Sequence, residues 1–433
     1  MRSQSDAEPR SGSADRAETD GSLDPEIHFD RRADAGQRPA RIAFLTGATG
    51  FLGANLLNDL LAHTALEVWC LTRAAGRGEA IGRLKWALEA QGLPRERLDG
   101  RVRPVLGDLG APRFGLDEGA WEALGRSVDV VYHSGAQINF LLPYRLLRRV
   151  NVVGTETILR LAAVTGRPVV HFVSSTKVFG AAKYAAFLSP ASIVCRETFE
   201  IASPPPGGSG YAQTKWAAER MVVAAAKRGL SASIYRLGML TPHSVTGGVG
   251  ADGAFSLMLL ACARLCAAPE LNADLHLTPV DVASRAIVEL SGRADAVGRA
   301  RHLMNPGPIA WSRIVVAMRE AGVVAKSMPY VEWRRLVVQH DRESEGEMEI
   351  LSALLSSGRP PFASAKRILG QEETLAALAE GGVAYPRDNL ELLARYFARA
   401  RQSVDPAEPD VVVPAETGLA SATPGWAGRA DAG

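Results

Sequence analysis

The sequence predicts an α/β fold in which a doubly wound parallel sheet is followed by a smaller, mostly helical substrate domain. Three observations support this prediction. An apolar run at 42–45 leads directly into a glycine-rich turn and a helical pattern. Strand-like and helix-like segments then alternate up to about residue 238, which is typical of a parallel sheet with helices on both faces. Beyond residue 240, helical patterns dominate.

The first element is the segment RIAFLTGATGFLG at 41–53, where strand, turn and helix follow each other without a gap. In that setting the glycines predict a Rossmann-type dinucleotide turn: Gly47 for the tight bend, Gly50 for the approach of a pyrophosphate, and Gly53 for helix–strand packing. The phosphates would lie on the N–H groups at the helix start. Cofactor contacts are expected from Gly47, Thr49, Gly50, Phe51, Leu52 and Gly53.

Two other interpretations of this turn exist. A nucleoside triphosphate loop is excluded, because no Lys-Ser or Lys-Thr pair follows the last glycine. A turn that merely needs small residues is the remaining alternative, and the flanking strand and helix argue against it.

The later elements can be placed in order along the chain. A loop is expected at 180–210, which contains Pro190 and the prolines at 204–206. Further strands are expected at 67–72, 102–109, 128–136, 167–175 and 231–237, with helices at 151–164 and 211–227. After residue 240, helices are expected at 254–266, 281–291, 309–320, 331–340, 345–356, 371–380 and 388–401, with a strand candidate at 300–304.

Four parts of the chain differ in composition. They are an N-terminal arm at 1–39, a dinucleotide-binding domain at 40–240, a mostly helical domain at 241–402 with some segments returning to the sheet, and a tail at 403–433. The arm has few large apolar groups, so most of it is expected to be disordered, with LDPEI at 23–27 as the candidate anchor. The tail is rich in Pro, Ala and Gly and is expected to be disordered too.

Composition limits the classes of partner. The formal net charge of +2 offers no electrostatic case for nucleic acid or an anionic membrane. The four cysteines show no metal-ligand spacing, and no metal site is expected. The N-terminus lacks the apolar core of a signal peptide, and the most apolar stretch, 254–266, is too short to span a bilayer. We therefore expect a cytoplasmic enzyme.

The end of the second predicted strand indicates which dinucleotide is bound. About twenty residues after the last glycine, where a carboxylate would bind the ribose 2′-hydroxyl of NAD, the chain carries Arg73. An arginine there favours the 2′-phosphate of NADP. Arg83, on the following helix, is a second candidate, and a solvated surface arginine is the alternative for each.

Two more strand ends carry cofactor candidates. Asp108 and Leu109 end the third predicted strand, where a carboxylate can accept from the adenine amino group, although Gly-Asp is also a common turn. Ser134, Gly135 and Ala136 end the fourth, and small residues there leave room for a cofactor at the carboxyl edge of the sheet.

The catalytic candidates lie in YAQTK at 211–215. Tyr211 and Lys215 share one helix face, where an ammonium is expected to lower the pKa of the phenol. Such a tyrosine can protonate a carbonyl oxygen as hydride reaches the carbon, and the lysine can also hold the nicotinamide ribose. One of the hydroxyls of Ser174, Ser175 and Thr176, at the end of the fifth strand, is expected to bond the same oxygen, and turn capping accounts for the others.

TGATGFLG at 46–53 together with YAQTK resembles the extended short-chain dehydrogenase/reductase superfamily. HSGAQINFLLPYRLLRRVNVVGTETILRLA, VHFVSSTKVFG, GYAQTKWAAERMV, LHLTPVDVASRAIVEL and RHLMNPGPIAW further resemble the thioester reductase domains of nonribosomal peptide and polyketide synthetases and of carboxylic acid reductases. The resemblance implies that Ser175, Tyr211 and Lys215 are catalytic, supports Arg73 and Arg83 as NADP contacts, and makes Asn151 a residue that shapes the site. Two departures are Ser175 where relatives often carry Thr, and Leu237 in place of a proline.

This resemblance implies NADPH-dependent reduction of an acyl or peptidyl thioester, held on the phosphopantetheine arm of a carrier protein, to an aldehyde and sometimes on to an alcohol. Because the chain has no room for fused adenylation and carrier domains, the carrier is expected to act in trans. The alternatives are a fatty acyl-CoA reductase, an NAD-dependent sugar-nucleotide epimerase or dehydratase, and a catalytically idle cofactor-binding protein.

Overall fold

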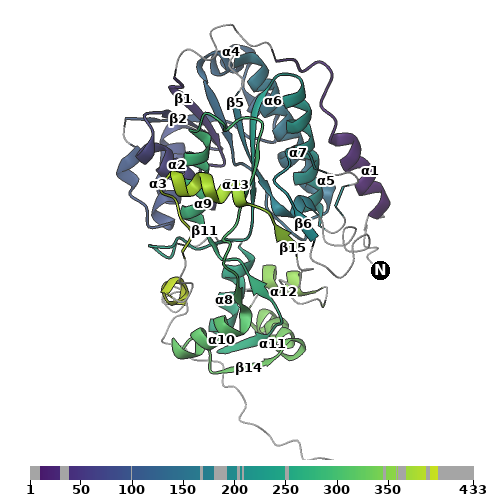
Figure 1. The fold of residues 1–433 in the computed structure, drawn as a ribbon, viewed down its shortest axis with the longest axis vertical. Coiled ribbons are helices and arrows are strands. Elements are labelled where there is room, and N and C mark those ends of the chain that lie inside the picture. The colour runs from purple at the N-terminus through teal and green to yellow at the C-terminus, as the bar shows by residue number, and fades with distance from the viewer. Residues whose placement is uncertain are drawn as a thin grey trace, which may run out of the picture.

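A seven-stranded parallel sheet forms the centre of the computed structural model (Figure 1). The structure describes residues 10–29, 39–98, 100–165, 169–179, 193–201, 205–206, 209–248, 253–344, 348–356, 358, 367–386 and 391–397. The sheet strands are β1 (Ile42–Thr46), β2 (Glu67–Thr72), β3 (Val102–Leu106), β4 (Val130–His133), β5 (Val169–Ser175), β7 (Ser231–Leu237) and β12 (Ala300–Leu303).

The strand order is β12-β7-β5-β4-β1-β2-β3, and every pairing is parallel. The order reverses between β1 and β4, so the carboxyl ends of these two strands form the switch point at which open α/β sheets bind ligands. The predicted fold class and all six predicted strands of the sheet are confirmed.

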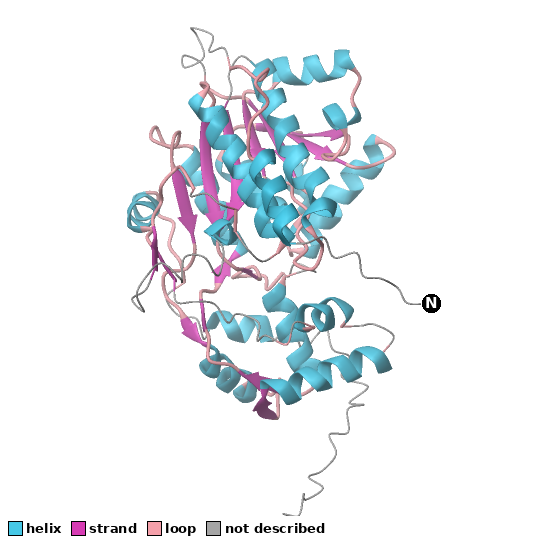
Figure 2. Cartoon of the chain, turned by 90° about the vertical axis from the view of Figure 1, so that its right-hand side faces the viewer, coloured by secondary structure: helices cyan, strands magenta, loops and turns pink. Residues whose placement is uncertain are grey.

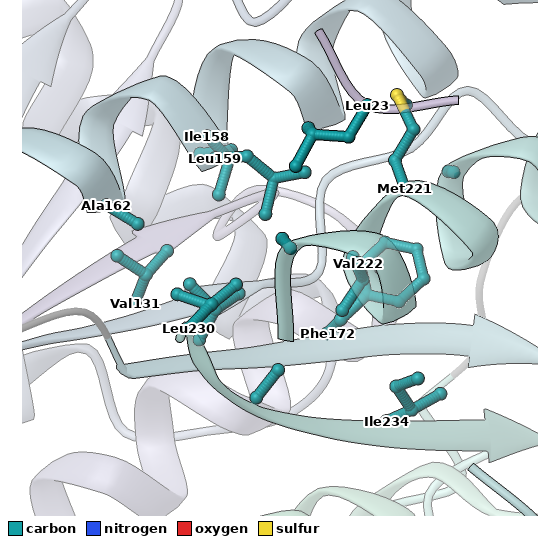
Figure 3. Packing of buried hydrophobic residues seen from close by; sticks show 14 of the residues in the cluster. Leu23, Val131, Ile158, Leu159, Ala162, Phe172, Met221, Val222, Leu230 and Ile234 are labelled. Atoms are coloured by element: carbon teal, nitrogen blue, oxygen red, sulfur yellow. The ribbon is translucent and has the colours of Figure 1, made fainter. Parts of the chain in front are cut away.

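Alternate residues of each strand enter opposite helix layers. Phe44 of β1 packs in one core cluster, whereas its neighbours Ala43 and Leu45 pack in the other, as the two-residue period of a strand requires. Figure 3 shows the first cluster, in which Phe172 and Ile234 of the sheet meet the helices. This layer contains α4 (Glu118–Ser127), α6 (Gly154–Thr165) and α7 (Gly210–Lys227), and the opposite layer contains α2 (Phe51–His63), α3 (Arg77–Ala90), α9 (Val280–Ser291) and α13 (Glu372–Glu380).

The N-terminal arm differs from its prediction. Residues 10–29 are ordered: α1 (Arg10–Asp20) packs beside α7, and the segment after it continues over the same layer. Leu23 and Ile27 are buried, so LDPEI does anchor the arm. Asp20 accepts hydrogen bonds from the Tyr144 hydroxyl and, at 2.6 Å, from Arg148. These contacts bury apolar side chains and pair a carboxylate with an arginine, which the polar composition of the arm does not predict. Residues 1–9, 30–38 and 403–433 lie outside the described residues.

A second, smaller body lies below the sheet in Figure 1 and is seen from the side in Figure 2. It has its own core, where Trp311 and Trp333 donate indole N–H bonds to backbone carbonyls of Pro269 and Ala267 at 2.7 and 2.9 Å. Its elements are α8 (Ala254–Arg264), β9 (Ala267–Glu270), β10 (Asp274–Leu275), β13 (Ile309–Ala310), α10 (Trp311–Glu320), β14 (Lys326–Pro329), α11 (Tyr330–Glu343), α12 (Glu349–Leu355) and a helical segment at 391–397. None of the described helices is both long and apolar enough to cross a membrane.

Some segments after residue 240 are expected to return to the sheet. β12, α9 and α13 come after this residue, and they belong to the sheet and to its helix layer. The chain passes between the two bodies beside the short parallel pair β8 (Leu240–Thr241) and β11 (Thr278–Pro279). Part of the loop expected at 180–210 is also strand, because β6 (Ile193–Cys195) pairs with β15 (Arg367–Leu369). A local sequence pattern cannot predict that segments this far apart in the chain pair as strands.

The interface of α2 and α9 buries one carboxyl group. The Ser284 hydroxyl donates to Asp59, and burial raises the pKa of Asp59 to about 6, although this hydrogen bond acts in the opposite direction. The folded protein therefore holds this proton more tightly than the unfolded chain does. The resulting loss of stability sets in as the pH rises from about 4 to about 6.

We predict that Asp59→Asn stabilises the protein above pH 6 and has little effect near pH 4, because the amide keeps an acceptor for Ser284 without a buried charge. The gain in the free energy of unfolding should be about 1–3 kcal/mol at pH 8. Urea denaturation at pH 4, 6 and 8 measures it. An Asp59→Asn effect that is the same at all three values would contradict the assignment.

Candidate active site

The glycine turn brings three backbone segments into direct contact. Gly47 has a φ of +78°, and a Cβ on it would lie 2.8 Å from the Cα of Gly135, at the end of β4. A Cβ on Gly53, in the first turn of α2, would lie 1.9 Å from the carbonyl oxygen of Gly47. The N–H of Gly50 donates to the same oxygen at 2.8 Å. Positions 47 and 53 therefore require glycine for steric reasons.

The turn leaves a suitable cradle for a dinucleotide. Gly50 precedes α2 and is exposed, and no side chain caps the N-terminus of the helix. The first N–H groups of α2 have no partner within the helix and lie at the switch point. This arrangement fits a pyrophosphate. Thr49, Phe51 and Leu52 lie in the same turn and helix start.

A chain of hydrogen bonds joins the ends of β1 and β4. The N–H of Gly135 donates to the Thr46 hydroxyl at 3.0 Å, and this hydroxyl lies 2.8 Å from His133 Nδ1. His133 Nε2 lies 3.0 Å from Thr155 Oγ1, which donates to the carbonyl oxygen of Asn151 at 2.7 Å. Since the Thr155 proton is used there, His133 must donate through Nε2 and accept at Nδ1. Burial lowers the pKa of His133 to about 3, so the ring is neutral.

Asn151 acts through the backbone of the site. It lies in a π-helical turn at 149–153 before α6, and its side chain is buried. Its amide accepts from the N–H of Gln137 at 2.7 Å and donates to the carbonyl oxygen of Gln137 and to the Thr214 hydroxyl, both at 3.0 Å. The Thr214 hydroxyl in turn donates to the carbonyl oxygen of Tyr211 at 2.8 Å. Asn151 thus ties the loop after β4 to α7, the helix that carries Tyr211 and Lys215.

The carboxyl ends of β3 and β4 lie beside this turn. The Asp108 carboxylate accepts from the N–H of Gly110 and from Arg149, each at 3.0 Å, so it already has two partners, and its adenine contact stays a prediction. Leu109 packs between Gly135 and Gly154, where a Cβ on either glycine would come within 2.9 Å of its side chain. Ser134 and Ala136 flank Gly135 and are partly buried.

Arg73 directly follows β2, one strand away from the glycine turn. Its side chain is exposed and makes no hydrogen bond or ion pair within the described part of the chain. Arg83 lies on α3 and is 4.0 Å from Glu79 in an exposed pair, which is a weak interaction. Both guanidinium groups are thus available to a phosphate.

The three catalytic candidates meet at the carboxyl end of β5. Tyr211, in the first turn of α7, lies near Ser175, the last residue of β5; burial raises the pKa of the Tyr211 phenol, and the Ser175 hydroxyl, which accepts from the N–H of Lys177 at 3.2 Å, acts to lower it. Lys215 donates to the carbonyl oxygen of Val173 at 2.7 Å, with its Nζ 4.1 Å from the centre of the Phe172 ring. Of the three hydroxyls considered, Ser175 therefore lies at the tyrosine, whereas Ser174 donates to Glu219.

The protonation states correct one expectation. Burial raises the pKa of Tyr211 to about 12, against the effect of the Ser175 hydroxyl, so the phenol is not acidified by Lys215 as the sequence suggested. Burial lowers the pKa of Lys215 to about 7, and the charge of Glu219 opposes this shift. Burial shifts both groups toward their neutral forms because neither charge is solvated, and Lys215, with a pKa of about 7, exists in both forms at neutral pH. A tyrosine that keeps its proton is in the correct state to act as a general acid.

Two residues next to Tyr211, Phe140 and Gly210, are not among the site residues predicted from the sequence. The Phe140 ring packs edge-on against the Tyr211 ring with centroids 5.5 Å apart. Gly210 lets the chain at 142–144 approach α7, since a Cβ there would lie 2.4 Å from the Tyr144 nitrogen. The position of Gly210 directly before the YxxxK pattern could have predicted this close approach. No local sequence feature predicts that Phe140 contacts Tyr211.

A family model described as male sterility protein, of the NAD-binding type, matches residues 45–287. This range includes the glycine turn and all three catalytic candidates. The chain belongs to this family. The resemblance to synthetase reductase domains is confirmed, because a solved structure of the terminal R domain from the myxalamid PKS-NRPS biosynthetic pathway matches with 34% sequence identity and a TM-score of 0.80, covering 90% of this chain and 98% of that domain.

The chain is also similar to two curated proteins. A linear gramicidin synthase polypeptide of Brevibacillus parabrevis is 36% identical over 388 residues, which cover 88% of this chain and 8% of that protein. The large subunit of L-2-aminoadipate reductase from Penicillium chrysogenum is 31% identical over 347 residues, which cover 77% of this chain and 25% of that protein. The chain thus spans a quarter or less of these two relatives. The predicted oxidoreductase class and a nicotinamide dinucleotide cofactor agree with these matches.

We predict that Gly53→Ala abolishes dinucleotide binding and lowers the free energy of unfolding by more than about 2 kcal/mol, because the new methyl group would overlap the backbone oxygen of Gly47. Gly82→Ala is the matched control. Gly82 lies inside α3 with nothing within 4 Å of a Cβ, so alanine should stabilise by roughly 0.5–1 kcal/mol. Urea denaturation and NADPH fluorescence titration measure both effects. Normal cofactor affinity in Gly53→Ala would refute the proposed cradle.

Proposed function

We propose that this chain is an NADPH-dependent reductase that releases an acyl or peptidyl thioester from a carrier protein as an aldehyde. The observation that carries the proposal is that Ser175, at the end of β5, lies near Tyr211, with Lys215 on the same face of α7, at the edge of the sheet that holds the glycine turn. The 34% identity to a synthetase terminal R domain supports a thioester as the substrate class.

The residues account for the chemistry as follows. When bound, the dinucleotide supplies the hydride that reduces the thioester carbonyl carbon. Ser175 and Tyr211 donate hydrogen bonds to the carbonyl oxygen, and Tyr211 transfers its proton there as negative charge develops. The product of this step is a hemithioacetal. Cleavage of its carbon–sulfur bond releases the pantetheine thiol and leaves the aldehyde.

The pKa values of the pair suit these roles. With a pKa near 12, the free Tyr211 keeps its proton at neutral pH and has it available for the carbonyl oxygen. After the transfer, Lys215 lies one helical turn away and can stabilise the phenolate as an ammonium. The same lysine can donate to a ribose hydroxyl, so it would serve both cofactor and tyrosine.

The alternatives predict different substrates. A fatty acyl-CoA reductase would use coenzyme A thioesters as readily as carrier thioesters. An NAD-dependent sugar-nucleotide epimerase is disfavoured by Arg73 at the position of the ribose-binding acid. A second reduction to the alcohol would use the same Tyr211 and Ser175 donors.

The decisive experiment incubates the protein and NADPH with an octanoyl thioester, linked either to a separately expressed phosphopantetheinylated carrier protein or to coenzyme A. We expect octanal by mass spectrometry and faster turnover on the carrier, which would also establish action in trans. Tyr211→Phe should bind NADPH normally but turn over about 10²–10⁴ times more slowly, since it lacks the general acid. Equal rates on coenzyme A would favour the acyl-CoA reductase. Near-normal turnover by Tyr211→Phe would refute the assigned acid.

We predict that Arg73→Ala weakens NADPH binding at least tenfold and leaves NADH binding nearly unchanged, because only NADPH carries the 2′-phosphate that a guanidinium binds. Arg77→Ala, another exposed arginine at the start of α3, serves as the comparison. Fluorescence titration with both cofactors gives the ratio. Equal weakening of the two affinities would rule out a 2′-phosphate contact.

A further inference from the structure

A fully buried ion pair lies on the same helix face as the catalytic residues. Tyr211, Lys215 and Glu219 follow each other at intervals of four along α7, so they share one face. Glu219 Oε1 accepts from both Nη2 and Nε of Arg236, at 2.6 and 2.9 Å. Both side chains have 0% exposure. A buried pair of this kind is weak evidence of stabilisation, because the desolvation of two charges opposes their attraction.

The second carboxylate oxygen connects this pair to the catalytic strand. The Ser174 hydroxyl donates to Glu219 Oε2. Ser174 directly precedes Ser175, and in the sheet it lies opposite Arg236 of β7, while Ser175 lies opposite Leu237. Glu219 therefore links the end of β5 to both α7 and β7 at the point where Ser175 lies near Tyr211.

The arginine is enclosed on its other sides. Its Nη1 lies 3.3 Å from Nε2 of His302, the residue opposite it on β12, and its Cζ lies 5.1 Å from the centre of the Phe179 ring. Burial, and then the arginine charge, lower the pKa of His302 to about 4, so this ring is neutral. The only carboxylate bonded to Arg236 within the described residues is therefore that of Glu219.

We propose that Glu219 and Arg236 are positioning residues, whose ion pair holds the Ser174–Ser175 end of β5 against α7 so that Ser175 meets Tyr211 beside Lys215. The inference rests on the proposed function for its kinetic consequence, but the positioning itself is a property of the unliganded protein. Glu219 also acts on Lys215 through its charge. The groups that face Lys215 are Glu219 and Tyr211 on its own helix and the neutral His133 on β4, so Glu219 is the anion that favours its ammonium form.

The first test reads Lys215 directly. The chain has seven lysines, so NMR titration of ¹³Cε-labelled lysine can follow Lys215, assigned by the loss of its signal in Lys215→Arg. Glu219→Gln keeps the size and an acceptor for Ser174 but removes the charge, and it should lower the Lys215 pKa by about one unit. Asp295→Asn is the comparison, since it also takes a carboxylate from a buried arginine, Arg301 at 3.1 Å, but outside α7 and β5 and with a side chain that is 42% exposed. It should leave the Lys215 titration unchanged.

The second test uses Ser174→Ala, which leaves both charges paired and so avoids the risk of unfolding that accompanies Glu219→Gln. We expect kcat on the octanoyl carrier thioester to fall about tenfold with little change in KM, because Ser175 is misplaced while the binding surfaces remain. In Glu219→Gln, the decline of activity at high pH should begin about one pH unit lower than in the wild type.

The outcomes separate the two proposals. If the wild type reduces no thioester, the proposed function fails, while the lysine titration still decides the positioning role. If Glu219→Gln folds and leaves the Lys215 titration unchanged, the charge role is wrong. If Ser174→Ala has wild-type kcat, or loses activity only in proportion to lost folded protein, the ion pair does not position the site.

Discussion

The close backbone approach of Gly47, Gly53 and Gly135 is the constraint on which the site depends. Three segments from β1, α2 and β4 meet at distances that exclude any Cβ. This contact sets the uncapped N-terminus of α2 at the switch point of the sheet. The position of a dinucleotide relative to β5 and α7 then follows from the sheet order alone, because β4 and β5 are neighbours.

Buried hydrogen bonds connect the glycine turn to the helix that carries Tyr211 and Lys215, the proposed catalytic residues. The chain from Gly135 through Thr46, His133 and Thr155 ends at Asn151, whose amide holds the loop after β4 and the first turn of α7. These groups are neutral, so they fix geometry without the desolvation cost of a charge. On the other side of Tyr211, the Glu219–Arg236 pair is charged and fully buried, and its cost is easier to explain if it serves the site.

Much of this architecture could be predicted from local patterns. The apolar runs indicated six sheet strands, and the glycines indicated the turn because their spacing reflects steric demands within one short segment. Tyr211 and Lys215 were found because helical spacing alone places them on one face. The order of the N-terminal arm was missed, since α1 is polar and is held by Asp20 contacts with residues 124 and 128 positions away.

The sequence by itself determined the fold class, the glycine turn and the shared helix face of Tyr211 and Lys215, because each can be inferred from patterns within short runs of consecutive residues. Only the tertiary structure decided which of three neighbouring hydroxyls lies near the tyrosine, that burial shifts Tyr211 and Lys215 toward their neutral forms, and that α9 and α13 cover the sheet that β12 joins. Burial and strand pairing set these features, and both arise from contacts between segments that the sequence keeps far apart.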